Sequence, residues 1–370
     1  MFPVKRKTSV IIFLIVTIGL GTFFPCARVA AQNRKFYFYH GYPFGSEATY
    51  NPISITINGG YGILLMGNRA KNPFTVDYRT GWRNVRENIT HPIREVKIYG
   101  WKHFVTTEIF PTSLVPRSAQ YLPNYQNHLI GGGMTYRMFR EWYVYHGYPQ
   151  STILALSTLT VYHVLNEVVE NNNYAGTNVD PIADILVFNP LGVLLFSDEG
   201  VVHFFAERLQ LRDWSYFPTI NPLNGNLENI GQNFAIKWRL PRQQTWSLFY
   251  NFGLNGIVGL SYRRKDGTSI SAGAGLMARN LRRVQRDDGV RSLTADLAWN
   301  VGIFYDRDGS LMASFLVSGS RAYKMRTNLY PGLIRIGNIS PGIFTIISRK
   351  NEVIFGMTLR GMPLGLAFQE

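Results

Sequence analysis

The chain has 370 residues and a formal net charge of +15; 14% of its residues are aromatic, only 16% are charged, and it contains 35 glycines. This composition is unusual for a soluble enzyme and suits a protein whose outer surface contacts lipid. The single cysteine, Cys26, excludes a disulfide framework and a cysteine metal site. The basic charge favours anionic headgroups, and no basic cluster interleaved with aromatic residues indicates nucleic-acid binding. We therefore expect membrane lipid as the partner, with lipopolysaccharide as one candidate, and no nucleic acid.

The N-terminus has the pattern of a secretory signal peptide. Lys5, Arg6 and Lys7 precede an apolar run over residues 10–24, and small residues follow before Gln32. A basic region, an apolar region and small residues before a cleavage point are typical of exported chains. We predict a signal peptide over residues 1–31. Its removal takes away four basic residues and lowers the formal net charge from +15 to +11.

Residues 32–120 contain two candidate strand regions. The segments "NPISITINGGYGILLMG" and "REVKIYGWKHFVTTEIFP" are rich in isoleucine, threonine, valine and aromatic residues, which are the residue types enriched in strands. The sequence predicts that residues 32–120 supply the N-terminal strands of a barrel.

Between residues 121 and 215 the hydrophobic period changes to that of a helix. Ile130, Met134, Met138 and Trp142 recur every four residues, so that one helical face is apolar. We predict an insert of three or four helices that plugs the barrel or packs at its mouth. None has the roughly 20 apolar residues of a membrane span, although an inner-membrane helical bundle remains an alternative.

Several runs within residues 216–370 alternate strictly, with one apolar face and one that is mostly polar or small. In "SLTADLAWNVGIFY", Leu297, Trp299 and Val301 share one face and Asp296 and Asn300 the other, which predicts strands with one apolar face. The pairs Asn255-Gly256, Asp266-Gly267 and Asp308-Gly309 are hairpin signals between such runs.

A soluble barrel or sandwich produces the same alternation. The predicted export and runs of about 9 to 11 residues favour membrane strands instead. We predict a mainly β protein of the bacterial outer membrane, an antiparallel up-and-down transmembrane barrel of about 10 to 14 strands. The apolar faces of its strands, carrying Leu297, Trp299 and Val301, are expected to face lipid.

The helical insert concentrates acidic and histidine side chains. His163, Glu167 and Glu170 are spaced i, i+4 and i+7, so one helical face presents all three. A histidine with carboxylates can bind a divalent metal or act as a base with its orienting acid. Neither the metal nor any other cofactor is specified by the pattern. The candidate catalytic residues are His128, His163, Glu167, Glu170, Asp180 and Asp184.

A purely structural interpretation stands beside this one. Glu167 and Glu170 are expected to pair with barrel arginines such as Arg263 or Arg360, because charged side chains in a polar lumen commonly pair with one another. Asp180, which precedes a proline, is expected to be a helix N-cap. His203 and Glu207 repeat the i, i+4 spacing on a later segment.

Four motifs resemble the DUF3943 family of uncharacterised bacterial envelope proteins. They are "PFGSEATYNPISITINGGYGIL", His128 followed by "GGGMTYR", then "NEVVEN", then "DPIADILVFNPLGVLLF", and together they cover roughly residues 43–205. The resemblance implies an outer-membrane barrel with embedded helices and supplies no established reaction. It differs at Asn166, where an aromatic residue usually precedes the first glutamate. The polar motif positions carried over are His128, Tyr136, Arg137, Glu167, Glu170, Asp180 and Asp184, and the glycine of the last helix is Gly192.

Three functions follow as hypotheses. The first is a structural or transport-related outer-membrane barrel whose helical plug is held by the His/Glu/Asp cluster. The second is a hydrolase that modifies envelope lipid and uses the same cluster as an acid and base or as a metal site. The third is a passive pore for small solutes, which requires an open lumen.

Overall fold

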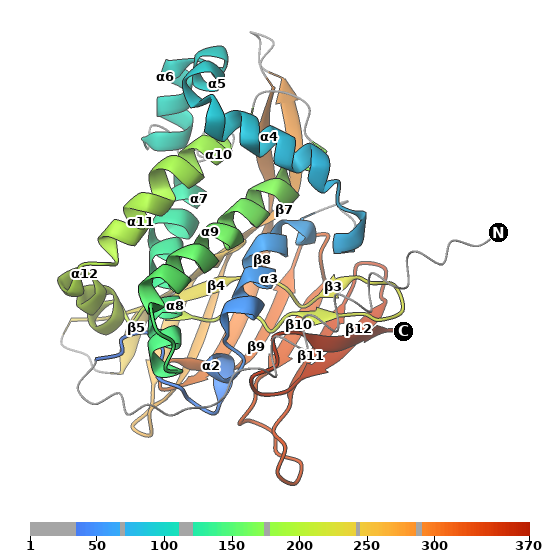
Figure 1. Ribbon diagram of the computed structural model, residues 1–370. Helices are drawn as coiled ribbons and strands as arrows, with labels where there is room; N and C mark the ends of the chain where they lie inside the picture. Colours follow the sequence, from blue (N-terminus) through green and yellow to red (C-terminus); the bar gives the residue numbers. More distant parts are fainter. Residues whose placement is uncertain (1–34, 67–70, 111–120, 174–177, 242–244, 286–290) are drawn as a thin grey trace.

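A computed structural model describes residues 35–66, 71–110, 121–173, 178–241, 245–285 and 291–370. The protein consists of a 13-stranded sheet and a layer of helices gathered on one side of it (Figure 1). The predicted signal peptide, residues 1–31, lies outside the described residues.

The N-terminal part is helical, so the prediction of barrel strands between residues 32 and 120 is wrong for the described residues. The first predicted strand region forms helix α3 and the turn η1, and the second forms α5, α6 and the π-helical turn η3. The elements are α2 (Gly45–Ala48), α3 (Pro52–Tyr61), η1 (Gly62–Leu65), η2 (Pro73–Thr75), α4 (Tyr78–Thr90), α5 (Pro92–Tyr99), α6 (Trp101–Phe104) and η3 (Val105–Ile109).

Helix α3 forms despite its β-branched residues because its start is strongly specified. The side chain of Asn51 accepts a hydrogen bond from Ser54 N, the Ser54 side chain accepts one from the backbone N–H of Asn51, and Pro52 occupies the first turn. This reciprocal cap satisfies two backbone donors. The helix then packs closely on a later helix, since a Cβ atom on Gly59 would lie 2.0 Å from the Tyr162 ring.

Between residues 121 and 208 the described chain forms four continuous helical runs, in agreement with the predicted three or four helices. Asp180 is the first residue of α10 and Val179 is its N-cap, so the prediction that Asp180 caps the helix is wrong. The runs are α7 (Tyr121–Pro123), η5 (Asn124–Gly132) and α8 (Gly133–Tyr145); α9 (Ser151–Glu170); α10 (Asp180–Ala183), η6 (Asp184–Phe188) and α11 (Asn189–Leu195); and α12 (Glu199–His203) with η7 (Phe204–Arg208).

The sheet is an up-and-down antiparallel meander from β4 to β13, and β2 joins β13 in parallel. Asp308 and Gly309 have φ values of 52° and 84° between β8 and β9, as a tight hairpin turn requires. The strands are β1 (Arg212–Asp213), β2 (Thr219–Ile220), β3 (Leu227–Glu228), β4 (Asn233–Arg239), β5 (Trp246–Gly253), β6 (Asn255–Arg263), β7 (Thr268–Gln285), β8 (Arg291–Arg307), β9 (Ser310–Ser318), β10 (Met325–Leu329), β11 (Gly342–Ile347), β12 (Val353–Thr358) and β13 (Gly365–Gln369).

The sheet curves strongly toward its helical side. Lys237 of β4 forms an ion pair with Asp306 of β8, and both side chains are buried. In a flat sheet these strands would lie about 19 Å apart, because neighbouring strands are spaced by about 4.8 Å. Lysine and aspartate side chains cannot bridge that distance, so the strands must curl toward each other.

One short segment contacts both the first and the last strand of the meander. Trp214 N donates to Asn233 O of β4 at 2.8 Å, and Gly365 N of β13 donates to Pro218 O at 2.9 Å. The same segment, residues 212–220, contains β1 and β2. The two ends of the ten-strand meander therefore approach one stretch of chain.

The outward face of the sheet is apolar and its inward face carries the polar side chains. Leu297, Trp299 and Val301 are 41%, 53% and 43% exposed, whereas Asn300 is fully buried and Asp296 is half-buried. The predicted division of the two faces is confirmed. Other exposed residues of this face include Trp238, Leu248, Val258, Leu260, Leu276, Ile303, Phe355, Met357 and Leu366; buried polar residues of the strands include Lys237, Asn251, Ser261, Ser271, Asp306, Ser314, Ser318, Asn328 and Thr358.

Among the described residues, helix α9 is long and apolar enough to cross a membrane, contrary to the prediction that no helix of the insert reaches that length. The pair formed by residues 180–195 and 199–208, bent by 81°, passes the same test when taken together. A core helix of a soluble protein also passes it, so this feature does not decide between classes. The same helices carry exposed apolar side chains on the outer side of the helical layer, including Ile153, Val161, Leu191 and Leu194.

We predict that Gly192→Ala destabilises the helical layer. A Cβ atom at this position would lie 2.6 Å from the carbonyl oxygen of Leu129, so two helices must separate, at a cost of about 1–3 kcal/mol. The midpoint of thermal unfolding in detergent measures the effect. Gly62→Ala is the matched control, because its Cβ atom would meet only a side-chain atom of Leu254 at 3.8 Å. Equal midpoints for the two variants would contradict this account of the packing.

Candidate functional site

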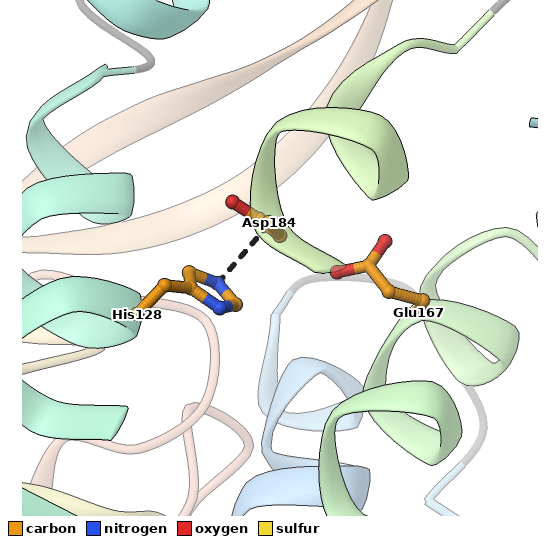
Figure 2. Close-up of side chains that lie close together, drawn as sticks. All are labelled: His128, Glu167 and Asp184. Atoms are coloured by element: carbon orange, nitrogen blue, oxygen red, sulfur yellow. Dashed lines mark ion pairs between the residues drawn. The ribbon is translucent and has the colours of Figure 1, made fainter. Parts of the chain in front are cut away.

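The structure brings three of the six predicted site residues into direct proximity. One ligand atom each from His128, Glu167 and Asp184 lies within 4.8 Å of the others (Figure 2). They come from η5, α9 and η6, three elements far apart in the chain. Glu167 and Asp184 are 1% and 2% exposed, so the cluster is almost closed to solvent.

The other three predicted residues surround this core. His163 lies one helical turn before Glu167, and its ring centroid is 5.1 Å from that of His128. Glu170, at the end of α9, and Asp180, at the start of α10, are near enough for their charges to act on Glu167 and Asp184. All six predicted residues thus belong to one acidic region, and His128, Glu167 and Asp184 form its centre.

His128 is held from both ring nitrogens. Its Nε2 is 3.1 Å from Asp184 Oδ2, and its Nδ1 is 3.1 Å from Asn189 Oδ1. Burial lowers the pKa of His128 to about 4, against the opposing effect of the Asn189 hydrogen bond, so the ring is neutral near pH 7. With Asn189 Oδ1 as acceptor, the ring proton lies on Nδ1 and the lone pair of Nε2 faces the Asp184 carboxyl group.

Glu108 is a member of this region that the sequence did not reveal. It lies in η3 and is 4% exposed, and Thr107 Oγ1 donates to its Oε1 at 3.1 Å. Burial, reinforced by the charge of Asp180, raises the pKa of Glu108 to about 8. No local pattern pointed to Glu108, because this glutamate stands in the segment predicted to be a strand.

Three asparagines also complete the site. Asn171 Nδ2 lies 3.5 Å from Glu167 Oε2, and Asn178 Nδ2 donates to Asn171 Oδ1 at 2.8 Å. Asn178 Oδ1 in turn accepts from Asp180 N, which connects the end of α9 to the start of α10. Asn189 orients His128, as described above. The resemblance motifs contained Asn171 and Asn189, but their spacing did not indicate these contacts.

The backbone at the site is unusual. His128, Asp184 and Glu108 all lie in π-helical turns, namely η5, η6 and η3. A π-helical turn inserts extra chain into a helix and redirects its side chains, and such turns often occur at functional sites. Regular α-helical spacing therefore could not place these three residues relative to Glu167.

The predicted pairing of Glu167 with a barrel arginine such as Arg263 or Arg360 is wrong. Among the described residues, Asp184 contacts the neutral His128 ring, and the largest charge effects on Glu167 and Asp184 come from other carboxyl groups, with no lysine or arginine among them. Arg263 is exposed to solvent. Two buried carboxyl groups with no basic partner retain a proton or bind a cation.

The remaining motif positions fix the helical layer. Arg137 Nε donates to Glu141 Oε1 at 2.9 Å and its Nη1 to Glu199 at 2.7 Å. Glu141 Oε2 also accepts from the backbone N–H groups of Tyr37, Phe38 and Tyr39. This network ties α8 to the N-terminal segment. Asn166 Nδ2 donates to Gly59 O, so the departure from the family pattern serves the contact between α9 and α3.

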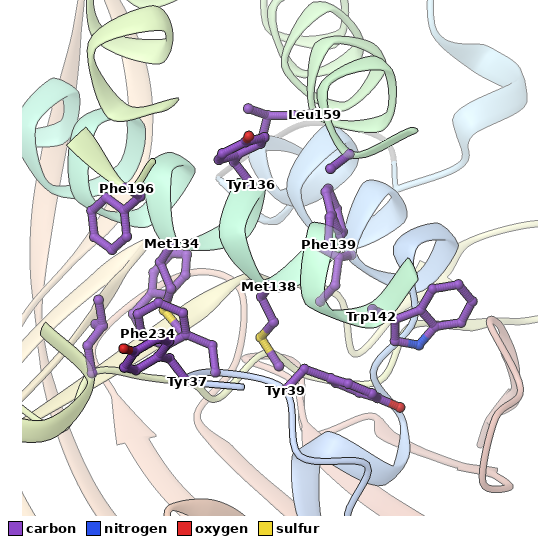
Figure 3. Packing of buried hydrophobic residues seen from close by; sticks show 14 of the residues in the cluster. Tyr37, Tyr39, Met134, Tyr136, Met138, Phe139, Trp142, Leu159, Phe196 and Phe234 are labelled. Atoms are coloured by element: carbon purple, nitrogen blue, oxygen red, sulfur yellow. The ribbon is translucent and has the colours of Figure 1, made fainter. Parts of the chain in front are cut away.

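Aromatic and methionine side chains join the helical layer to the sheet below the cluster. Met134, Met138 and Phe139 of α8 pack with Phe234 of β4 and with Tyr39 of the N-terminal segment (Figure 3). Tyr136, another motif residue, is buried in the same core. This packing gives the cluster a rigid support. His203 and Glu207, in contrast, are exposed on α12 and η7 and do not join it.

No family model matches the chain, and neither a curated protein nor a solved structure is significantly similar to it. The resemblance to the DUF3943 family therefore stays a prediction from the motifs. Chemically, the geometry offers a neutral imidazole next to two buried carboxyl groups, which can share a proton or coordinate a cation.

We predict that Glu108 makes the protein less stable as the pH rises. Its pKa in the folded protein, about 8, exceeds the ordinary value of 4.5, so its protonated form contributes stability below pH 4.5 that is lost as pH rises through 8. Glu108→Gln should flatten this part of the stability profile. Thermal unfolding measured from below pH 4.5 to above pH 8 tests it. Glu207→Gln, on the exposed η7, is the control and should leave the stability profile unchanged. If the stability of Glu108→Gln falls with rising pH as steeply as that of the wild type, Glu108 is not the group responsible.

Proposed function

We propose that this protein is an outer-membrane protein whose sheet is embedded in lipid. The supporting observation is the inverted pattern of the strands, in which leucine, valine and tryptophan face outward while serine, asparagine and an ion pair face inward. Water disfavours such an apolar surface, whereas hydrocarbon accepts it. The predicted signal peptide agrees with export to this membrane.

The sheet forms the greater part of a closed barrel in this proposal. Its support is the segment of residues 212–220, which contacts β4 at one end of the meander and β13 at the other. Closure pairs the backbone N–H and C=O groups at the edges of the sheet, for which lipid offers no hydrogen-bond partners. The helical layer covers the polar face of the sheet, as a plug does, and presents its own apolar side outward.

The role that the geometry supports best is structural or transport-related, without a permanently open pore. The inward side of the sheet is filled by aromatic residues such as Trp214, Phe249 and Phe304 and by the ion pair of Lys237 and Asp306. The His/Glu/Asp cluster joins three helical elements and fixes the plug. Membrane lipid, including lipopolysaccharide, is the expected partner, and its recognition does not require a lumen.

The membrane assignment predicts a large effect of Val258→Arg. Val258 is 63% exposed on β6. Arginine on the lipid face of a barrel costs about 2–4 kcal/mol near the middle of the bilayer, whereas an exposed substitution on a soluble protein changes stability by about 0.5 kcal/mol or less. Folding into lipid vesicles, followed by urea titration, measures the difference.

Ile336→Arg is the matched control for Val258→Arg. Ile336 is 67% exposed but lies in the loop between β10 and β11, outside the long strands. We expect this control to fold like the wild type. If both variants fold equally well into vesicles, the outward face of the sheet does not contact lipid.

We predict that the purified protein does not conduct ions in planar bilayers. Aromatic side chains pack together on the inward side of the sheet, and we expect them to block a continuous water path. Single-channel recording at increasing voltage tests this, with a known porin as positive control. Stable conductance steps would favour the passive-pore hypothesis over the closed barrel.

A lipid-modifying hydrolase is the second candidate, and one observation favours it. His128 Nε2 lies 3.1 Å from Asp184, a distance suited to a base and its orienting acid. The cluster is nearly inaccessible, which argues for a structural role. Mass spectrometry of envelope lipids distinguishes the two, because Asp184→Asn abolishes a lipid modification only if the protein is an enzyme.

A further inference from the structure

We propose that His128, Glu167 and Asp184 bind a divalent transition-metal ion. This site goes beyond the membrane role and does not depend on it. The ion would connect η5, α9 and η6, and so three separate helical runs.

The arrangement of the three side chains fits one ion. Metal–nitrogen and metal–oxygen bonds measure about 2.1 Å, so two ligand atoms on one ion lie at most about 4.2 Å apart. The atoms of His128, Glu167 and Asp184 lie within 4.8 Å of one another. On a tetrahedral ion the ligand atoms lie about 3.4 Å apart, so the more distant atoms must approach by up to about 1.4 Å through side-chain rotation.

The charges at the site call for a cation. Glu167 and Asp184 are both almost fully buried, and no described lysine or arginine pairs with them. Burying carboxylates without a partner is unfavourable. One divalent ion compensates both negative charges, in place of the protons that the buried carboxyl groups would otherwise retain.

His128 is oriented as a metal ligand would be. Asn189 Oδ1 accepts the Nδ1 proton, so the unprotonated Nε2 faces Asp184 Oδ2 at 3.1 Å. Metal-bound histidines usually donate their other ring nitrogen to such an oxygen, which fixes the tautomer. An ion bound to both atoms would take the place of a carboxyl proton between them.

His163 is an independent sign that a ligand is expected. It is 3% exposed, and neither ring nitrogen has a hydrogen-bond partner in the described structure. Its Nε2 points at η5, since it lies 3.2 Å from where a Cβ atom of Gly132 would be. Asp184 Oδ1 is likewise buried and unpartnered. Unsatisfied buried polar atoms are rare in folded proteins.

The ligand types select the class of metal. Imidazole nitrogen with carboxylate oxygens suits zinc, iron or manganese, whereas calcium and magnesium prefer oxygen ligands alone. We therefore expect zinc to bind well and calcium to bind weakly.

The test uses the full mature chain in detergent, without a polyhistidine tag and after treatment with a chelator. Isothermal titration with Zn²⁺ should give one ion per chain, and Co²⁺ should give a visible absorption band that Zn²⁺ abolishes. Zn²⁺ should also raise the midpoint of thermal unfolding, because it binds the folded state. Calcium at the same concentrations should do neither.

Glu167→Gln and Asp184→Asn should each lower the affinity for Zn²⁺ at least 100-fold. Asn189→Leu, which leaves all ligands in place, should lower it about 10- to 100-fold through loss of orientation. Glu207→Gln is the control, since Glu207 lies four residues after a histidine on an exposed helix; its affinity should equal that of the wild type. Heat-modifiable migration on gels reports whether each variant folds.

Several outcomes would overturn the proposal. They are the absence of one-to-one Zn²⁺ binding by the folded wild type, unchanged affinity in Asp184→Asn, or loss of binding in Glu207→Gln. If Glu167→Gln does not fold, the proposal is tested by the Zn²⁺ affinity of Asn189→Leu and by the Co²⁺ absorption band of the wild type. Failure of metal binding leaves the membrane assignment untouched, because that assignment rests on Val258→Arg.

Discussion

The apolar outer face of the sheet is the constraint on which the rest of the structure depends. Side chains such as Trp299 and Val258 face outward, so the residues that alternate with them, such as Asn300 and Ser261, face inward. Inside, these groups need partners, because burying unpaired polar groups is unfavourable. The pair of Lys237 and Asp306 is one such solution, and it also requires the sheet to curl.

A curled sheet with a polar inner face creates a second requirement, which is a cover. The helical layer meets it by packing Met134, Met138 and Phe139 onto strand β4. Its helices approach closely because they meet at glycines: neighbouring atoms leave no space for a side chain at Gly133 or Gly192. The carboxyl groups and histidines of the cluster are then buried between helical elements. That location isolates them from the many lysines and arginines of the chain.

Prediction from sequence succeeded where one local rule was sufficient. Period-two alternation in the segment around Leu297 and Trp299 is a direct consequence of strand geometry, and the structure confirms it. The same reasoning failed for residues 52–61, where isoleucines and threonines suggested a strand. Their helix is set by the capping box of Asn51 and Ser54 and by packing against α9. Composition describes preference, and tertiary contacts override it.

The sequence by itself determined the two faces of the strands around Trp246, Leu260 and Trp299, the helical nature of most of residues 121–215 and the grouping of His163 with Glu167, because these features depend on neighbours a few residues apart. Only the tertiary structure decided that His128 and Asp184 meet Glu167, that Glu108 joins them and that no described basic side chain balances them. The reason is physical. π-helical turns shift side chains out of the regular helical register, and contacts between distant segments depend on packing that no local spacing encodes.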